Sequence, residues 1–220
     1  MVCLMTAPPL YILAHKGIWR SKEEQNTISA CRVALASGFG LQVDIRDHVG
    51  GLVVAHDVDD AGSYPFRKLC TLLQQHPDAT LALNIQSGGL QDLLCEALAH
   101  HGISNYFLFD MAVPDLLASL RSGLRCFTRQ SELETTPILY PQSHGVWVDM
   151  FEQDWLTSND IRMHIKHAKD VAIVSPELHG RDQLPFWQYL KDHWASLNDT
   201  GSKCYLCTAY PEQAREFFYG

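Results

Sequence analysis

The chain has 220 residues, 46% of them hydrophobic, a mass of 24.8 kDa and a formal net charge of −8 at pH 7. This length suits one well-buried core and is short for two, so we expect a single domain over residues 1–220. The negative charge, without a cluster of lysines and arginines, argues against a nucleic-acid-binding surface. No apolar run approaches the roughly 18 residues of a membrane span, so stable membrane insertion is not expected either.

The cysteines and the beginning of the chain bear on the compartment. Seven cysteines, an odd number, are scattered through apolar segments, and MVCLMTAPPL lacks the features of a secretory signal. We therefore expect a reducing, cytoplasmic setting in which thiols serve as small apolar residues. Cys204 and Cys207 form a CxxC pattern within a probable strand, where positions three apart face opposite ways, so we expect no redox or zinc role.

Short apolar runs alternate with helical patterns along the whole chain. Strands are predicted at residues 11–14, 40–45, 80–86, 106–110, 124–128, 145–149, 171–175 and 203–207. Helices are predicted at residues 26–38, 65–76, 89–101, 113–122, 157–168, 182–196 and 211–218, with only a turn after the fifth strand. Such βα alternation predicts a parallel (β/α)8 barrel, the TIM barrel, in an α/β fold that is compact beside the usual ~250 residues.

Polar side chains stand at the downstream ends of the first strands. His15 and Lys16 follow the first strand directly, and alternation in the second puts Gln42 and Asp44 on one face. If the apolar residues of that strand pack under the helices, the polar pair faces the barrel interior. His56 follows a further apolar run.

The third strand continues this arrangement. Asn84 and Gln86 share one of its faces and would line up with Gln42 and Asp44 at the barrel mouth. Because barrel enzymes keep their chemistry at the carboxyl ends of the strands, these side chains form the candidate site.

These segments carry a resemblance to a known family. AHKG, QNT, Q-V-D and VVAHD, in this order over about the first quarter of the chain, resemble the glycerophosphodiester phosphodiesterases, whose segments usually read HRG, ENT, E-x-D and HD. That family belongs to the phosphatidylinositol phospholipase C-like phosphodiesterase superfamily. The resemblance implies a (β/α)8 barrel that hydrolyses small-molecule phosphodiesters, with His15 and His56 as acid and base. It also implies a divalent metal, Mg²⁺ or Ca²⁺, with Asp44 as a ligand.

The sequence departs from the family pattern at the metal site. Gln42 stands where the family has glutamate, and Asn84 is the counterpart of a further glutamate, so two carboxylates become amides. Amide oxygens can still be ligands, but hard cations bind mainly through anionic oxygens. We therefore expect a weak metal site of Asp44, Gln42 and Asn84, or one completed by other acids such as Asp47, Asp57 or Asp110.

The expected reaction uses two histidines. Water or a substrate hydroxyl attacks phosphorus while one histidine takes a proton and the other protonates the leaving alkoxide. Substrate binding is expected from Lys16, Gln86 and Tyr210, the last in TAYP where the family has TDYP. Which histidine is the acid, the identity of the two alcohols and the oligomeric state stay open.

Two other functions remain open. The first is a pseudoenzyme of the same fold that binds a phosphorylated ligand or partner. The second is a metal-free barrel isomerase or lyase, although no strand-end lysine stands out as a Schiff-base candidate. Two further histidines, His164 and His167, lie at i and i+3 of a predicted helix without a third ligand, and we expect them at the surface.

Overall fold

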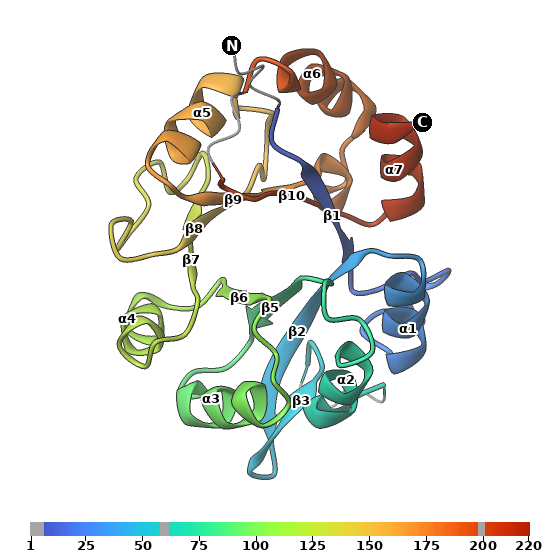
Figure 1. Ribbon diagram of the computed structural model, residues 1–220, viewed down its shortest axis with the longest axis vertical. Helices are drawn as coiled ribbons and strands as arrows, with labels where there is room; N and C mark the ends of the chain where they lie inside the picture. The colour runs from blue at the N-terminus through green and yellow to red at the C-terminus, as the bar shows by residue number, and fades with distance from the viewer. Residues whose placement is uncertain (1–6, 58–61, 198–200) are drawn as a thin grey trace, which may run out of the picture.

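The computed structural model describes residues 7–57, 62–197 and 201–220, and within them eight parallel strands form a closed ring (Figure 1). Each strand pairs with the next in parallel, and the last pairs with the first. A single bridge, Leu108 to Cys126, joins the fourth and fifth. In ring order the strands are β1 (Leu10–His15), β2 (Gly40–His48), β5 (Leu81–Ile85), β6 (Tyr106–Phe109), β7 (Phe127–Gln130), β8 (Gly145–Val148), β9 (Asp170–Val174) and β10 (Cys204–Thr208).

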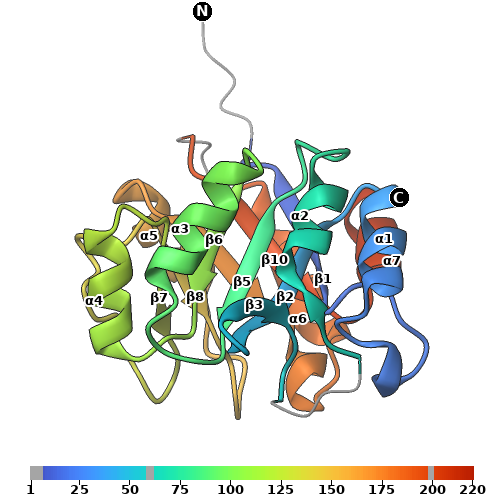
Figure 2. The same ribbon diagram turned by 90° about the horizontal axis from the view of Figure 1, so that it is seen from below.

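Helices cover the outside of this ring (Figures 1 and 2). Each of them lies where a helical pattern was predicted, and no helix separates β7 from β8. The predicted TIM barrel is therefore confirmed. The helices are α1 (Ile28–Ala36), α2 (Phe66–Leu73), α3 (Gln91–His100), α4 (Val113–Arg121), α5 (Ser158–Lys166), α6 (Leu184–Trp194) and α7 (Pro211–Tyr219).

The strands differ from prediction in two places. Strand β2 runs on past its predicted end and pairs with the antiparallel strand β3 (Gly51–Val54), which in turn pairs with the short β4 (Tyr64–Pro65). This hairpin brings His56 back to the barrel mouth. Strand β7 begins later than predicted, and before it Cys126 forms only the isolated bridge to Leu108, while its N–H donates to His144 Nδ1 (3.3 Å).

Aromatic side chains fill the barrel interior. Phe107 stacks on Phe127 with ring centroids 3.8 Å apart, and Phe109 stacks on Trp147 at 3.7 Å. A second apolar layer of leucine, valine and isoleucine lies between the strands and the helices. Because the ring is packed solid, a substrate can be bound only at its ends.

The helices and the cysteines bear on the expectations about membrane insertion and compartment. None of the helices in the described part of the chain is long and apolar enough to cross a membrane. No disulfide joins the cysteines that the structure describes, and Cys204 and Cys207 both lie buried in β10. The cytoplasmic location stays a prediction.

The expectation that His164 lies at the surface was wrong. This residue of α5 is completely buried, with Nδ1 2.9 Å from the Tyr140 hydroxyl and Nε2 2.8 Å from Gln130 Oε1. The helix turns it inward, onto the loop between β7 and β8, where two polar partners satisfy both ring nitrogens. Burial lowers the pKa of His164 to about 4.

This burial predicts a pH dependence of stability. Since the unfolded chain binds a proton to this histidine below about pH 6.5 and the folded chain does not, stability falls as the pH drops from about 6.5 towards 4. At about pH 5 the residue's contribution to this loss is about 2 kcal/mol. Urea unfolding at about pH 7.5 and pH 5 should show a smaller difference for His164→Asn than for the wild type.

The exposed His193 on α6 provides a control. His193→Gln should keep the full wild-type difference between the two pH values. An equally steep loss of stability in His164→Asn would contradict this account of the buried ring.

Candidate active site at the carboxyl ends of the strands

The first part of the site is a tight turn after β1. His15 ends the strand, Lys16 follows with φ of 60°, and Gly17 has φ of 89°. A Cβ on Gly17 would lie 2.6 Å from the Ala30 carbonyl carbon, so only glycine lets α1 approach this closely. The turn is also tied to β2, because the Lys16 N–H donates to the Gln42 carbonyl (2.8 Å).

Asp44 lies at the centre of the site, on the inward face of β2, with no exposed surface. Its Oδ2 contacts Lys16 Nζ (2.9 Å), Asn26 Nδ2 (2.9 Å) and His56 Nδ1 (3.0 Å). Its Oδ1 accepts N–H groups from the amides of two neighbours, Gln42 (3.2 Å) and Gln86 (3.4 Å). Five nitrogen atoms of the described residues therefore surround one carboxylate, which we call the Asp44 cluster.

The partners of Asp44 keep it ionised. Burial alone raises the pKa of a carboxyl group, but Lys16, Asn26 and His56 outweigh it and hold the pKa of Asp44 below its usual range. A buried carboxylate without such partners is strongly unfavourable, and removing one partner of a buried ion pair typically costs about 3–5 kcal/mol. The cluster is therefore a fixed pairing of charges in the fold.

His15 has a different environment. Its Nδ1 is buried and has no partner among the described residues. Burial and the neighbouring Lys16 lower the pKa of His15 to about 3, although Asp44 acts in the opposite direction. His15 is therefore neutral at physiological pH, with one ring nitrogen as a donor and the other as an acceptor.

His56 is the outer member of the Asp44 cluster. About half of its side chain is exposed, and its carbonyl accepts a hydrogen bond from Arg46 Nη1 (2.9 Å). The imidazole is thus oriented by a carboxylate through Nδ1 and faces solvent with the rest of the ring. This arrangement suits a group that exchanges protons with a substrate.

The remaining predicted residues divide into two sets. Gln42, Asn84 and Gln86 line the same end of β2 and β5, since Asp44 stands opposite Asn84 in the parallel register. Buried oxygens of two of these amides, Gln42 Oε1 and Asn84 Oδ1, have no partner within the described ranges. Tyr210 is exposed before α7, and no interaction links it to the Asp44 cluster in the described part of the chain.

The side chains around Asp44 do not fit a divalent cation. Such an ion lies about 2.0–2.6 Å from its oxygen ligands, so it would have to displace the nitrogen atoms that surround both Asp44 oxygens. No three His, Cys, Asp or Glu side chains within residues 7–57, 62–197 and 201–220 group as metal ligands. Gln42 and Asn84 offer neutral oxygens, which give a cation no charge with which to compete against Lys16.

The pairings of three residues at this end of the barrel were not predicted from the sequence, although Asp149 was recognisable as a polar residue at a strand end. Asn26 was predicted as the first residue of the helix over 26–38, but Thr27 caps α1 and Asn26 is a buried partner of Asp44. Its place in the QNT segment was the signal that could have found it. His179 and Asp149, which pair on the far side of the mouth, belong to no recognisable motif.

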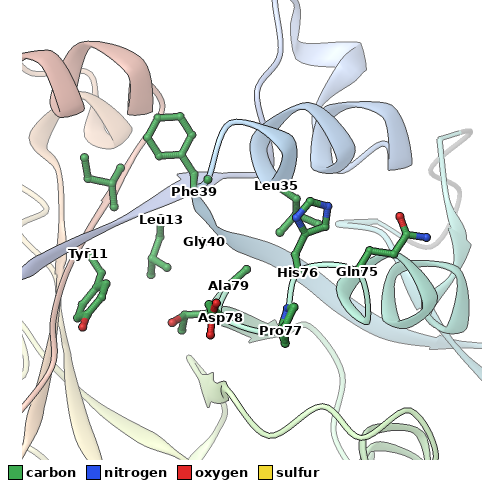
Figure 3. A pocket seen from close by; sticks show the side chains of 13 residues that line it. Tyr11, Leu13, Leu35, Phe39, Gly40, Gln75, His76, Pro77, Asp78 and Ala79 are labelled. Carbon is green, nitrogen blue, oxygen red and sulfur yellow. The ribbon is translucent and has the colours of Figure 1, made fainter.

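A separate pocket of about 430 Å³ lies at the other end of the barrel (Figure 3). It is lined by residues at the beginnings of strands, including Tyr11 of β1 and Gly40 of β2. None of the predicted site residues lines it. The chemistry of this fold belongs to the carboxyl ends, so we place the candidate site there.

Comparisons with known proteins place the fold. No family model matches the sequence, and no curated protein does. Among solved structures, a glycerophosphodiester phosphodiesterase from Parabacteroides distasonis superposes with a TM-score of 0.68 at 12% identity, covering 97% of this chain and 98% of that one. One from Agrobacterium tumefaciens gives 0.63 at 14% identity, with 96% and 99% covered.

A further barrel superposes less well. The tryptophan synthase A-subunit from Pyrococcus furiosus gives a TM-score of 0.51 at 13% identity, with 97% of this chain and 96% of that chain covered. At such identities the likeness concerns the fold. This chain therefore has the TIM-barrel architecture of glycerophosphodiester phosphodiesterases along nearly its whole length.

Proposed function

We propose that this chain is a phosphoric diester hydrolase that acts on small, glycerophosphodiester-like molecules. The observation that carries the proposal is the Asp44 cluster, in which a lysine ammonium and a half-exposed imidazole share one buried carboxylate. An ammonium binds a phosphoryl oxygen, and an imidazole moves a proton. These are the two tasks of phosphodiester hydrolysis that the reacting groups do not perform themselves.

Lys16 supplies the positive charge in this proposal. Its Nζ has three N–H groups, and Asp44 is its partner among the described residues, so N–H groups remain for a non-bridging phosphoryl oxygen. The ammonium is mostly buried, with 14% of the side chain exposed, which strengthens its attraction for an anion. Lys16 thus takes the role for which the sequence led us to expect a metal ion.

His56 takes the proton of the attacking water, and Asp44 stabilises the imidazolium that forms. His15, which is neutral, can donate or accept a hydrogen bond at the substrate without transferring a proton. The unpartnered oxygens of Gln42 and Asn84 face the same end of the barrel. They can accept hydrogen bonds from the hydroxyl groups of a glycerol-like alcohol.

The pseudoenzyme is the second candidate, and one observation favours it. Nitrogen atoms already surround both Asp44 oxygens, so the carboxylate is occupied in holding Lys16 and its neighbours in place. A site that only binds phosphate would need such a fixed ammonium and no further reacting group. Substrate turnover separates the two functions, since both predict that phosphate binds near Lys16.

The first prediction concerns turnover. The wild type should hydrolyse glycerophosphocholine or bis(p-nitrophenyl) phosphate, and His56→Gln should lower kcat by about 10²- to 10⁴-fold, as expected for the loss of a general base. Because hydrolysis of a diester leaves a phosphomonoester and an alcohol, a coupled assay for glycerol phosphate and choline measures the first substrate, and p-nitrophenolate absorbance measures the second. His193→Gln, on the outside of α6, should match the wild type; a fully active His56→Gln would exclude this base.

A second prediction concerns the cation. Because Lys16 supplies the charge, EDTA should leave wild-type kcat/KM unchanged, while Lys16→Gln should lower it by about 10²-fold or more. Thermal unfolding of the variant checks the fold, since Asp44 loses its ion-pair partner. Loss of wild-type activity in EDTA, restored by Mg²⁺ or Ca²⁺, would show that a metal ion, and not Lys16, neutralises the charge on the phosphoryl oxygens.

A third prediction restores the carboxylates. Without a metal ion, the double variant Gln42→Glu, Asn84→Glu should be less stable than the wild type. Millimolar Mn²⁺ or Mg²⁺ should raise its Tm by several degrees, because the two new carboxylates and Asp44 can bind the ion together. The wild type should gain little. An equal rise in the wild type would contradict the account of the donor set.

A further inference from the structure

We propose that His179, held by Asp149, is the proton donor to the leaving oxygen, a role that the sequence led us to assign to His15 or His56. This inference rests on the proposed hydrolysis and names its acid. It comes from a second pair of imidazole and carboxylate, on the other side of the barrel mouth from the Asp44 cluster.

The pair stands at the ends of two neighbouring strands. Asp149 directly follows β8, and His179 is the last residue of the 3-10 helix η2 (Pro176–His179) that follows β9. His179 Nε2 lies 2.5 Å from Asp149 Oδ1, and Asp149 Oδ2 accepts the Trp147 indole N–H (3.3 Å). The carboxylate is thereby fixed by a core tryptophan, and it fixes the imidazole.

Neighbouring contacts hold the segment that carries His179. Glu177 accepts hydrogen bonds from the Thr208 hydroxyl (2.5 Å) and the Ala209 N–H (3.0 Å), which bind η2 to the end of β10. Beyond η2, Arg181 donates to Asp154 and to the Met150 carbonyl. The ring is therefore a positioned group.

Both pairs lie at the carboxyl ends of parallel strands, and so at the same end of the barrel. The buried Cys207 of β10 has its thiol pKa raised by burial first, and then by Glu177, Asp149 and Asp44 together. His179 also contributes to lowering the pKa of His15. His15 at the end of β1 and His179 after β9 thus both belong to the carboxyl end of the ring.

The chemistry of an acid favours His179 over His15. A general acid must present an N–H group to the leaving oxygen from a fixed position, and Asp149 fixes the His179 ring through Nε2. His15 has no such partner and is neutral. His179 has Asp149 at Nε2, is 23% exposed, and its Nδ1 has no partner within the described residues, so Nδ1 can face a ligand.

The position of the two pairs suits an in-line displacement. Asp44 stands on β2 and Asp149 directly follows β8. In the ring order these strands are four apart, on opposite sides of the eight-stranded barrel (Figure 1). The attacking and leaving oxygens of a phosphoryl transfer also lie on opposite sides of phosphorus. A phosphorus atom bound between the pairs would have His56 on the side of attack and His179 on the side of departure.

The step balances in protons and bonds. A bond forms from the water oxygen to phosphorus, and the bond from phosphorus to the leaving oxygen breaks. His56 receives the water proton, and the His179 imidazolium gives its proton to the leaving oxygen. Exchange with solvent then returns both rings to their starting states.

Leaving groups of different acidity test the assignment. An alkoxide such as that of glycerophosphocholine needs a proton to depart, whereas p-nitrophenolate does not. His179→Gln should therefore lose about 10²- to 10⁴-fold in kcat with glycerophosphocholine and less than about 10-fold with bis(p-nitrophenyl) phosphate. Asp149→Asn should show the same selectivity to a smaller degree, and His193→Gln should lose neither activity.

The outcomes separate this inference from the proposed function. An equal loss with both diesters, or no loss with either, overturns the role of His179 and leaves the hydrolase standing. A selective loss of the alkyl activity in His15→Gln instead assigns the acid to His15 and also overturns it. Failure of the wild type to hydrolyse either diester overturns the proposed function and this inference together.

Discussion

A buried, ionised carboxylate organises one end of this barrel. Asp44 has no contact with solvent, and an unpaired charge in such a place would cost several kcal/mol. The chain meets this constraint with one nitrogen from each of five segments: the turn after β1, the entry to α1, β2 itself, the β3 hairpin and the end of β5. The same pairing that stabilises the charge therefore gathers Lys16, His56 and the amides into one site.

The charges of this end of the barrel are consistent with an internal cation. Two carboxylates at positions 42 and 84 would help to neutralise a divalent ion. Two neutral amides at these positions leave Asp44 to neutralise a monovalent ammonium. Gln42 and Asn84 are neutral, and each stands on the same end of β2 and β5 as Asp44. They match Lys16, whose ammonium already lies 2.9 Å from the remaining carboxylate.

The sequence predicted the barrel because strand and helix periodicities depend on local residue order. It also placed His15 at the end of the first strand and Asp44 on the inward face of the second. What it could not predict are pairings set by the ring as a whole: the approach of Lys16 to Asp44, the inward turn of His164, and the meeting of His179 with Asp149. Asn26 shows the same limit, since a residue typical of a helix cap became a partner of a carboxylate 18 positions away.

The two sides of the mouth depend on the core in different ways. On the β2 side, buried polar groups hold the histidine. On the β8 side, the Phe109 ring stacks on Trp147, whose indole N–H fixes Asp149, which in turn orients His179. Aromatic packing inside the barrel is thus linked directly to the position of a site imidazole. Because a densely packed core resists displacement of its side chains, the position of Trp147 limits how far the Asp149–His179 pair can move.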